Sequence, residues 1–551
     1  MIITDILTKN AQSFRDDISL VEVNPEIQEK IDKAWKEFDL VEAIPKPSNR
    51  QTLTWGQFER RANKIARYFL GEGVTKGSKV AMLLMNCIGW LPIYFGILKT
   101  GAVVAPMNFR FSAEEIKYCL ELSESDVLVF GSEFISRIDA VKDSLTGIRQ
   151  FIFAGNRKDC PEYALFIEDL LEEMPDSNVH IQINEEDDAA IYFSSGTTGF
   201  PKAVLHTHKS LLASCYTENN NHNQTKDDVF LCIPPLYHTG AKMHWFGSFL
   251  VGGKGILLRG VSPKWILKTI SEEKATVCWL LVPWAQDILD AIDSGEVNLD
   301  DYELSQWRLM HIGAQPVPPS LIKRWKKVFP NHQYDTNYGL TESLGPGCVH
   351  LGMENIHKVG AIGIPGEGWE TVIFDENKKP VKRGEVGELA VKGPSVMKCY
   401  YRNEEATAQT LYGEWLMTGD MAMQDEDGFI FLVDRKKDVI ISGGENLYPV
   451  EIENFIRQNE KVKDVAVIGT PDKRLGEIAT AVIEIKPGME CTVEEINAFC
   501  EGMPRYKRPK QIIFADIPRN PTGKIEKPKL RKIYSGESVV AQQNEISVSD
   551  K

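Results

Sequence analysis

The clearest candidate for chemistry is a short loop rich in hydroxyls and glycines. Its members are Ser194, Ser195, Gly196, Thr197, Thr198, Gly199 and Lys202. Glycines let a backbone approach a ligand closely, and hydroxyls, amides and an ammonium are donors for anionic oxygens. The spacing is not that of the common Gly-x-x-x-x-Gly-Lys-[Ser/Thr] phosphate loop. A phosphate-binding loop and an ordinary glycine-rich surface turn are therefore both open at this point.

The elements around this loop place other unusual loops beside it. Short apolar runs alternate with helical segments and predict strands at 79–84, 101–106, 189–193, 229–235, 276–282, 307–313 and 333–338. This alternation indicates an α/β fold with parallel strands. Ligands of such sheets bind beyond the carboxyl ends of the strands. We therefore expect the loops 236–240, 313–316 and 338–343 to converge on the loop 194–202.

The pattern of predicted secondary structure changes twice further along the chain. Residues 358–434 show short β segments with glycine turns, including a hairpin turn at 425–428. A compact α+β pattern follows, so we expect an N-terminal region 1–435, a C-terminal domain 436–534 and a disordered tail 535–551. The helices predicted from apolar periodicity and caps are 25–38, 54–69, 90–99, one after the capping box 112–115, 449–458 and 492–501.

Composition excludes several classes of protein. The chain has 551 residues and a net charge of −15, which argues against non-specific binding of nucleic acid. No run of 18 apolar residues predicts a membrane span. The ten cysteines are scattered without a Cys-x-x-Cys pair, so neither a disulfide framework nor a zinc site is indicated. A reducing, cytoplasmic setting is the expectation.

Seven motifs in this order resemble those of the adenylate-forming superfamily, which contains acyl-CoA synthetases, amino-acid adenylation domains and firefly luciferase. They are 194–202, 235–238, 313–316, 338–342, 415–420, 434–446 and 520–524. The resemblance extends to about residue 533. It implies two α/β subdomains and a β-barrel, followed by a small mobile α+β domain. It also implies a reaction in which a carboxylate attacks the α-phosphate of MgATP and the thiol of CoA then displaces AMP.

The resemblance implies a role for particular residues. The loop 194–202 and Thr341 match residues that contact phosphate, and Glu342 matches the residue that binds Mg²⁺. Lys524 matches the lysine that orients the carboxylate and stabilises the transition state, although composition alone would make it a surface lysine in a basic segment. The matches on the adenosine side are Gly313, Ala314, Gln315, Asn337, Tyr338, Gly339, Asp420, Leu432 and Arg435. Two departures from the family pattern, Ala203 and Gln315, remove no charge.

Further matches concern the acid, the thiol and domain movement. Lys437 matches the hinge about which the small domain turns between the two half-reactions, and Ser442, Gly443 and Gly444 match the loop on the CoA side. The acyl pocket is assigned to Tyr237, His238, Met243, Trp245, Val282 and Gly313. His238 has a structural role as its alternative. The bulky rings favour a medium-chain, branched, cyclic or aromatic acid over a long straight chain.

Two other functions are compatible with the same motifs. A stand-alone adenylation enzyme would load a separate carrier protein in place of CoA. A non-catalytic sensor would bind nucleotide or acyl-adenylate only, but the joint presence of Lys524, Glu342, Asp420 and Arg435 argues against it. The expected partners are therefore a small carboxylic acid, ATP and CoA, with a homodimer possible.

Overall fold

The computed structural model describes residues 1–25, 49–194, 201–313, 317–442, 445–519 and 525–534. The predicted helix 25–38 and the tail 535–551 lie outside these residues, apart from Pro25. No helix within the described part of the chain is long and apolar enough to cross a membrane.

An eight-stranded sheet carries the first α/β unit, in the order β19-β9-β8-β4-β3-β5-β6-β7. Its strands are β3 (Lys79–Leu83), β4 (Val103–Pro106), β5 (Val127–Phe130), β6 (Gln150–Phe153), β7 (Leu165–Phe166), β8 (Asp188–Ser194), β9 (Lys202–Thr207) and β19 (Cys399–Tyr400). All pairs are parallel except those that β9 makes with β8 and β19. The predicted parallel pairing is thus confirmed for most of this sheet.

A nine-stranded sheet carries the second unit, in the order β16-β15-β14-β13-β12-β10-β11-β1-β2. Its strands are β1 (Ile18–Val23), β2 (Arg50–Thr54), β10 (Val229–Cys232), β11 (Lys254–Leu258), β12 (Val277–Leu281), β13 (Leu309–Gly313), β14 (Gln333–Leu340), β15 (Gly345–His350) and β16 (Ile364–Pro365). Six neighbouring strands of this sheet pair parallel, in the order β1-β11-β10-β12-β13-β14. Their carboxyl ends therefore share one edge of the sheet. β2, β15 and β16 pair antiparallel.

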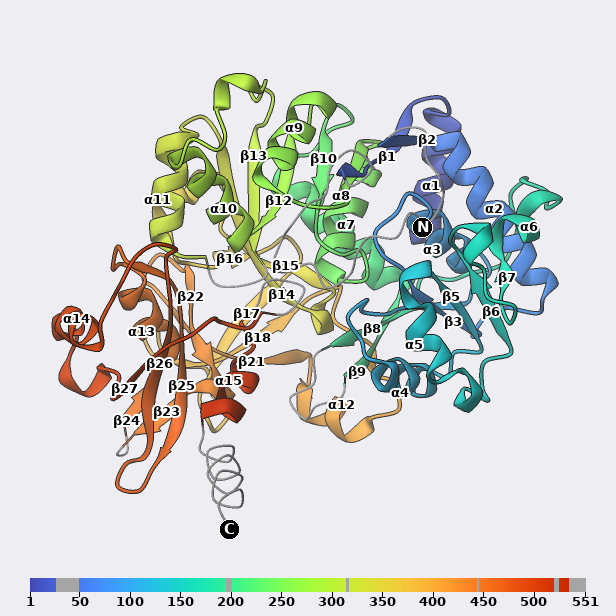
Figure 1. Ribbon diagram of the computed structural model, residues 1–551. Coiled ribbons are helices and arrows are strands. Elements are labelled where there is room, and N and C mark those ends of the chain that lie inside the picture. The colour runs from blue at the N-terminus through green and yellow to red at the C-terminus, as the bar shows by residue number, and fades with distance from the viewer. Residues whose placement is uncertain (26–48, 195–200, 314–316, 443–444, 520–524, 535–551) are drawn as a thin grey trace, which may run out of the picture.

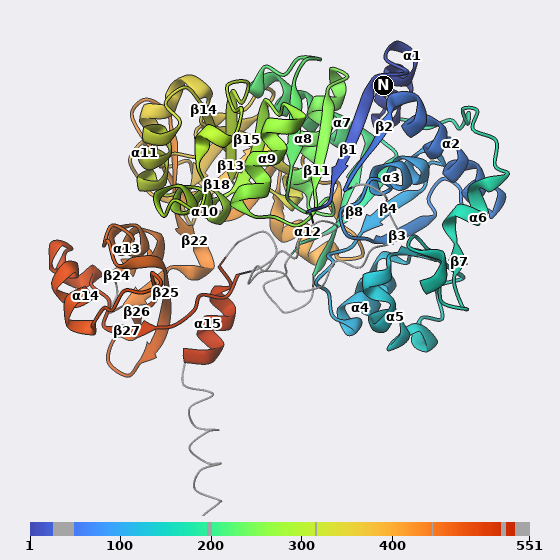
Figure 2. The same cartoon turned by 45° about the horizontal axis from the view of Figure 1, so that its top comes forward.

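Helices cover both sheets, and some of them lie between the two (Figures 1 and 2). They are α1 (Ile3–Ser13), α2 (Trp55–Gly71), α3 (Trp90–Lys99), α4 (Ala113–Ser123), α5 (Ile135–Asp139), α6 (Ile167–Glu172), α7 (His208–His222), α8 (Thr239–Leu250), α9 (Pro263–Glu273), α10 (Val282–Asp293) and α11 (Pro319–Val328). The rings of Trp55 on α2 and Phe249 on α8 meet edge to face at 4.8 Å, in a core that both units share. The capping box predicted at Ser112 and Glu115 starts α4.

The β-rich region is an antiparallel sheet, in the order β17-β18-β21-β20 with β22 on β21. Its elements are β17 (Glu370–Phe374), β18 (Gly387–Lys392), α12 (Glu404–Thr410), β20 (Leu411–Tyr412), β21 (Trp415–Gln424) and β22 (Ile430–Arg435). The predicted hairpin turn at 425–428 joins β21 to β22, with Gly428 at a φ of 91°.

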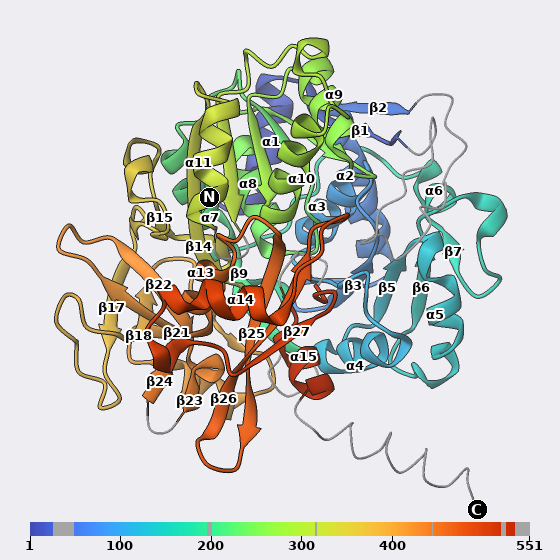
Figure 3. The same ribbon diagram turned by 60° about the vertical axis from the view of Figure 1, so that its left-hand side comes forward.

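The C-terminal unit has its own sheet and core, and lies to one side of the rest (Figures 2 and 3). Its elements are β23 (Ile440–Ser442), β24 (Glu445–Leu447), α13 (Pro449–Ile456), β25 (Val462–Asp472), β26 (Gly476–Ile485), α14 (Val493–Phe499), β27 (Gln511–Phe514) and α15 (Lys527–Tyr534). The domain boundary near residue 436 stays a prediction; β22 ends at Arg435 and β23 begins at Ile440.

Candidate active site

The hydroxyl-rich loop leaves from and returns to a β-hairpin. Ser194, the last residue of β8, lies opposite Lys202, the first residue of β9. The ammonium of Lys202 lies 4.6 Å from the ring centroid of Tyr400, on the adjacent strand β19. An aromatic face attracts a cation, so Tyr400 helps to hold Lys202 where the loop rejoins the sheet. The predicted phosphate ligands in between, Ser195, Gly196, Thr197, Thr198 and Gly199, lie outside the described residues.

Tyr400 also contacts the predicted magnesium ligand. Its hydroxyl donates to Oε1 of Glu342 at 2.7 Å, and the N–H of Met397 donates to the carbonyl oxygen of Glu342 at 2.7 Å. Burial and the charge of Glu342 raise the pKa of Tyr400, so the phenol keeps its proton and acts as a donor. Mg²⁺ prefers carboxylate oxygens and the phosphates of its substrate. A carboxylate and an ammonium held by one tyrosine therefore fit a magnesium–phosphate group.

Thr341 is held through its backbone. It opens a 3₁₀ turn, Thr341–Ser343, directly after β14. Nε2 of His206 lies 2.9 Å from the carbonyl oxygen of Thr341. Burial lowers the pKa of His206 to about 4, so the ring is neutral and Nε2 carries the proton that it donates. Since His206 and Lys202 both belong to β9, one strand positions both the predicted phosphate-binding turn and the ammonium.

A second cluster joins β14 to the hairpin β21–β22. The hydroxyl of Tyr338 donates to Oδ2 of Asp420, and Nε of Arg435 lies 2.5 Å from Oδ1 of the same carboxylate. Burial would lower the pKa of Arg435, but the negative charges of the carboxylates Asp420, Asp438 and Glu342 raise it. Arg435 therefore carries its charge beside both clusters. Leu432, on the same strand, packs against the core that contains Tyr338.

The end of β13 meets β14 at the predicted adenine wall. Gly313 is the last residue of β13, and a Cβ placed on it would lie 3.5 Å from Oδ1 of Asn337. Asn337 and Gly339 flank Tyr338 on β14. Ala314 and Gln315 lie outside the described residues. The structure thus brings Gly313, Asn337 and Tyr338 to one place, as expected from strands that end at a common edge.

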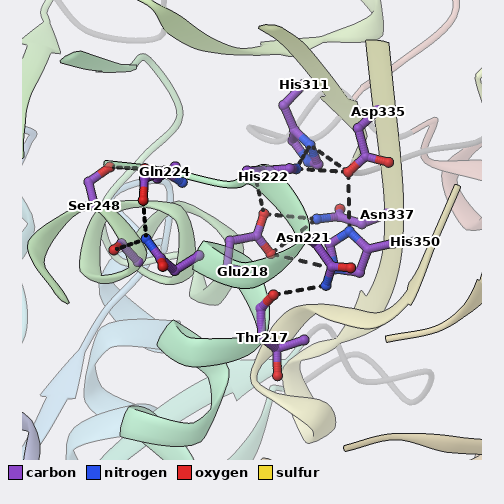
Figure 4. Close-up of polar contacts among 12 residues, drawn as sticks. Thr217, Glu218, Asn221, His222, Gln224, Ser248, His311, Asp335, Asn337 and His350 are labelled. Carbon is purple, nitrogen blue, oxygen red and sulfur yellow. Dashed lines mark hydrogen bonds and ion pairs between the residues drawn. The ribbon is translucent and has the colours of Figure 1, made fainter. Parts of the chain in front are cut away.

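A buried polar cluster lies behind Asn337 (Figure 4). It contains Glu218 and His222 from α7, His311 from β13, Asp335 from β14 and His350 from β15, all nearly or fully buried. Two overlapping triads within it have ligand atoms that lie within 4.8 Å of one another, close enough to be considered for a metal ion. The distances from Oδ2 of Asp335 are 2.7 Å to Nε2 of His222 and 3.1 Å to Nδ1 of His350, which are those of hydrogen bonds. We interpret the cluster as a hydrogen-bonded network.

Four of the residues predicted to line the acyl pocket lie in different environments, whereas the side chain of Met243 lies outside what the structure describes. Tyr237 packs edge to face on Phe109 at 5.5 Å. Nδ1 of His238 accepts the N–H of Gly240 at 3.2 Å and so caps α8, which is the structural alternative considered above. Trp245 is fully buried among Phe230, Phe249 and Gly255, so its contacts are those of a core residue. Val282 is also buried, at the start of α10.

The C-terminal unit contacts the eight-stranded sheet's unit through a residue that precedes Lys524. Lys524 itself lies outside the described residues, but Arg519 and Ile525 form a β-bridge on either side of its segment. The carbonyl oxygen of Arg519 accepts from Nη1 of Arg110 at 3.4 Å. Arg110 precedes Phe111, whose ring lies 6.3 Å from that of Phe193 on β8. This contact anchors the base of the Lys524 segment near the start of the hydroxyl-rich loop.

The predicted hinge lies where the chain passes between the two units. Lys437 belongs to the 3₁₀ turn Lys436–Asp438, and burial lowers its pKa. The flanking residues tie the turn to both units, since Lys436 contacts Glu388 on β18 at 3.0 Å and Asp438 contacts Arg531 on α15 at 2.6 Å. Ser442 ends β23 and pairs with Gly476, whereas Gly443 and Gly444 lie outside the described residues.

Comparison with known proteins identifies the class. A model of AMP-binding enzymes matches residues 32–401, and a model of the AMP-binding enzyme C-terminal domain matches residues 451–524. The chain belongs to the family of AMP-binding enzymes. It shows the α/β architecture of that family, with a large N-terminal region and a small C-terminal domain.

Individual relatives narrow the class to CoA ligases. The long-chain-fatty-acid–CoA ligase FadD13 of Mycobacterium tuberculosis is 31% identical over 90% of this chain and 96% of its own. A feruloyl-CoA synthase of Amycolatopsis is 32% identical over 88% and 94%. The structure of the anthranilate CoA ligase AuaEII with anthranoyl-AMP matches with a TM-score of 0.85 and 26% identity, over 98% of each chain. The chain is thus an AMP-forming acyl-CoA synthetase that forms an acyl-adenylate and uses ATP, Mg²⁺ and CoA.

Three residues of this region were not predicted from the sequence. Tyr400, His206 and Glu218 belong to none of the seven motifs identified in the sequence. The pairing of β9 with β19 brings Tyr400 beside Lys202. His206 on β9 reaches Thr341 after β14, and Glu218 on α7 reaches Asn337 on β14. Each of these contacts joins segments far apart in the sequence, so the motifs alone did not identify the three residues.

Proposed function

We propose that this enzyme activates a compact carboxylic acid (medium-chain, branched, cyclic or aromatic) and transfers the acyl group to CoA. The observation that carries the choice of acid is the contact of Tyr237 with Phe109. Tyr237 follows β10 in the nine-stranded sheet, and Phe109 follows β4 in the eight-stranded sheet. A pair of rings at this junction would shorten an acyl pocket that ran between the two sheets, and would disfavour a long straight chain. The relatives are named for a long-chain fatty acid, feruloyl-CoA and anthranilate, so sequence identity alone does not choose among these acids.

The two clusters supply the groups needed for adenylation. The carboxylate oxygen of the acid forms a bond to the α-phosphorus of ATP, and the bond to the departing pyrophosphate breaks. Lys202 and the loop before it hold the departing phosphates, and Glu342 holds the Mg²⁺ that offsets their charge. Asp420 and Arg435 bind the ribose side, and Tyr338 lies against the base. Lys524 orients the attacking carboxylate.

Thioester formation needs a different arrangement of the small domain. The sulfur of CoA bonds to the acyl carbon, AMP leaves, and the thiol proton passes to solvent. We place the rotation at Lys437, between two turn residues that contact opposite units, and the thiol near Ser442, Gly443 and Gly444. Such a rotation lets one site serve two half-reactions.

A panel of acids tests the proposal directly. Thioester formation with ATP and CoA is measured for octanoate, a branched acid, benzoate, cinnamate and palmitate. We expect a higher kcat/KM for at least one of the first four than for palmitate, and a shift towards palmitate in Phe109→Ala. Phe151→Ala, which removes a ring of the same sheet packed on Phe130 and Tyr163, is the matched control. A preference of the wild type for palmitate would exclude the compact pocket.

A further inference from the structure

A carboxylate in the buried cluster faces the predicted adenine wall. Glu218 lies on α7, one turn before His222, and is fully buried. Its Oε1 and Oε2 lie 3.3 Å and 3.4 Å from Nδ2 of Asn337 (Figure 4). Acidic side chains are almost never fully buried unless they are paired. This side chain therefore needs compensation, and its contacts show where that comes from.

Two imidazoles each bridge Glu218 to a second carboxylate. His222 lies 3.3 Å from Glu218 through Nδ1 and 2.7 Å from Asp335 through Nε2. His350 lies 3.8 Å from Glu218 through Nε2 and 3.1 Å from Asp335 through Nδ1. Burial lowers the pKa of His222, but the two carboxylates outweigh it and raise that pKa. Positive charge between the carboxylates favours Glu218 in its ionised form.

An ionised Glu218 determines which way the amide of Asn337 points. A carboxylate accepts hydrogen bonds and cannot donate them, so it requires the amide nitrogen of Asn337 on its side. The amide oxygen is then left on the side of Gly313, where a Cβ would lie 3.5 Å from it. Asn337 therefore presents an acceptor at the wall formed by Gly313 and the neighbouring Tyr338.

We propose that Glu218 is a positioning residue that sets the base specificity of the nucleotide site. By holding the amide of Asn337, it directs Oδ1 to the exocyclic amino group of adenine. Hypoxanthine and guanine carry a carbonyl oxygen at that ring position, which cannot donate to Oδ1. One unpaired buried acceptor corresponds to a loss of about 10- to 100-fold. The inference rests on the proposed placement of adenine beside Gly313 and Tyr338.

The test measures preference for ATP over ITP, whose base is hypoxanthine. Pyrophosphate release with the best acid of the panel gives the ratio of kcat/KM values for the two nucleotides. Glu218→Gln can donate as well as accept, so the amide of Asn337 is free to turn and the ratio should fall about tenfold or more. A uniform structural defect would lower both values and leave the ratio unchanged.

A double-mutant cycle shows whether Glu218 acts through Asn337. Asn337→Ala should lower the ratio to a similar extent, and adding Glu218→Gln to it should change the ratio no further. Gln224→Ala is the matched control, because Gln224 is a buried polar residue near the cluster that bonds to Ser248 at 2.5 Å. It should retain the wild-type ratio.

The outcomes separate this inference from the proposed function. An unchanged ratio in Glu218→Gln and in Asn337→Ala overturns the inference while thioester formation stands. Where Glu218→Gln fails to fold, the ratio in Asn337→Ala decides. Where the wild type forms no thioester from any acid of the panel, the proposed function fails. The inference is then decided by the dissociation constants of ATP and ITP, measured calorimetrically on the same proteins.

Discussion

Replacing Tyr400 with phenylalanine separates the two roles of its side chain. The variant keeps a ring beside the Lys202 ammonium, 4.6 Å from the centroid in the wild type, but removes the hydroxyl that donates to Glu342 at 2.7 Å. A hydrogen bond to a charged group contributes about 1.5–3 kcal/mol. Loss of such a partner of a metal ligand typically lowers metal affinity about 10- to 100-fold. The Mg²⁺ concentration for half-maximal pyrophosphate release should therefore rise about tenfold or more.

The ring is tested by a second substitution at the same position. Tyr400→Leu also removes the aromatic face under Lys202, a contact that contributes about 0.5–2 kcal/mol. We therefore expect Tyr400→Leu to raise the KM for ATP at saturating Mg²⁺ about 2- to 30-fold. In Tyr400→Phe this KM should stay near the wild-type value, because the ring is retained.

The adjacent tyrosine provides the control. The hydroxyl of Tyr401 donates to the exposed carboxylate of Glu124, away from Glu342. Tyr401→Phe should therefore keep the wild-type dependence on Mg²⁺. A Tyr400→Phe enzyme with that same dependence would refute the reasoning, since Glu342 would then bind Mg²⁺ without help from the phenol or not bind it at all.

Three further predictions concern the C-terminal domain and stability towards acid. Lys524→Ala should suppress pyrophosphate release by orders of magnitude more than thioester formation from supplied acyl-AMP, and equal losses would remove its assigned role. Lys437→Pro should spare adenylation and block transfer to CoA; normal overall turnover would argue against the hinge. His206, buried with a pKa of about 4, binds fewer protons in the native than in the unfolded state, so its contribution to stability is complete above about pH 6.5 and is lost as the pH falls towards 4. The free energy of unfolding should fall by about 3 kcal/mol over this pH range because of His206. In His206→Gln, unfolding by denaturant should show a pH dependence without this contribution.

Local patterns were sufficient for much of the fold. The helix predicted from Trp90 to Lys99 has those bounds, and the apolar run before the hydroxyl-rich loop is the buried strand β8. These elements are strongly periodic or strongly apolar, so tertiary contacts agree with local preference. The antiparallel pairs of β8 with β9 and of β14 with β15 could not be read in this way. Strand direction depends on long-range packing, and the residues of these strands are compatible with either partner.

The same distinction between local pattern and long-range contact applies to the candidate site. Residues in ordered motifs, such as Glu342 and Asp420, could be predicted because each motif combines unusual residue types at fixed spacing. Tyr400 and Glu218 were not predicted, because they lie outside these motifs and their partners come from distant segments of the chain. The structure shows what these side chains contact: one holds a carboxylate and an ammonium, and the other holds an amide.

Contacts that hold the predicted binding residues in place have a functional consequence. Asp420 already has one oxygen on Tyr338 and the other on Arg435. A ribose would therefore meet a carboxylate whose orientation is set before binding, and little side-chain entropy would be lost on binding. The same holds for Glu342 on Tyr400 and for Asn337 on Glu218. These three predicted ligand contacts are thus each held by a partner from a distant segment, and ribose, metal and base selectivity should depend on those partners.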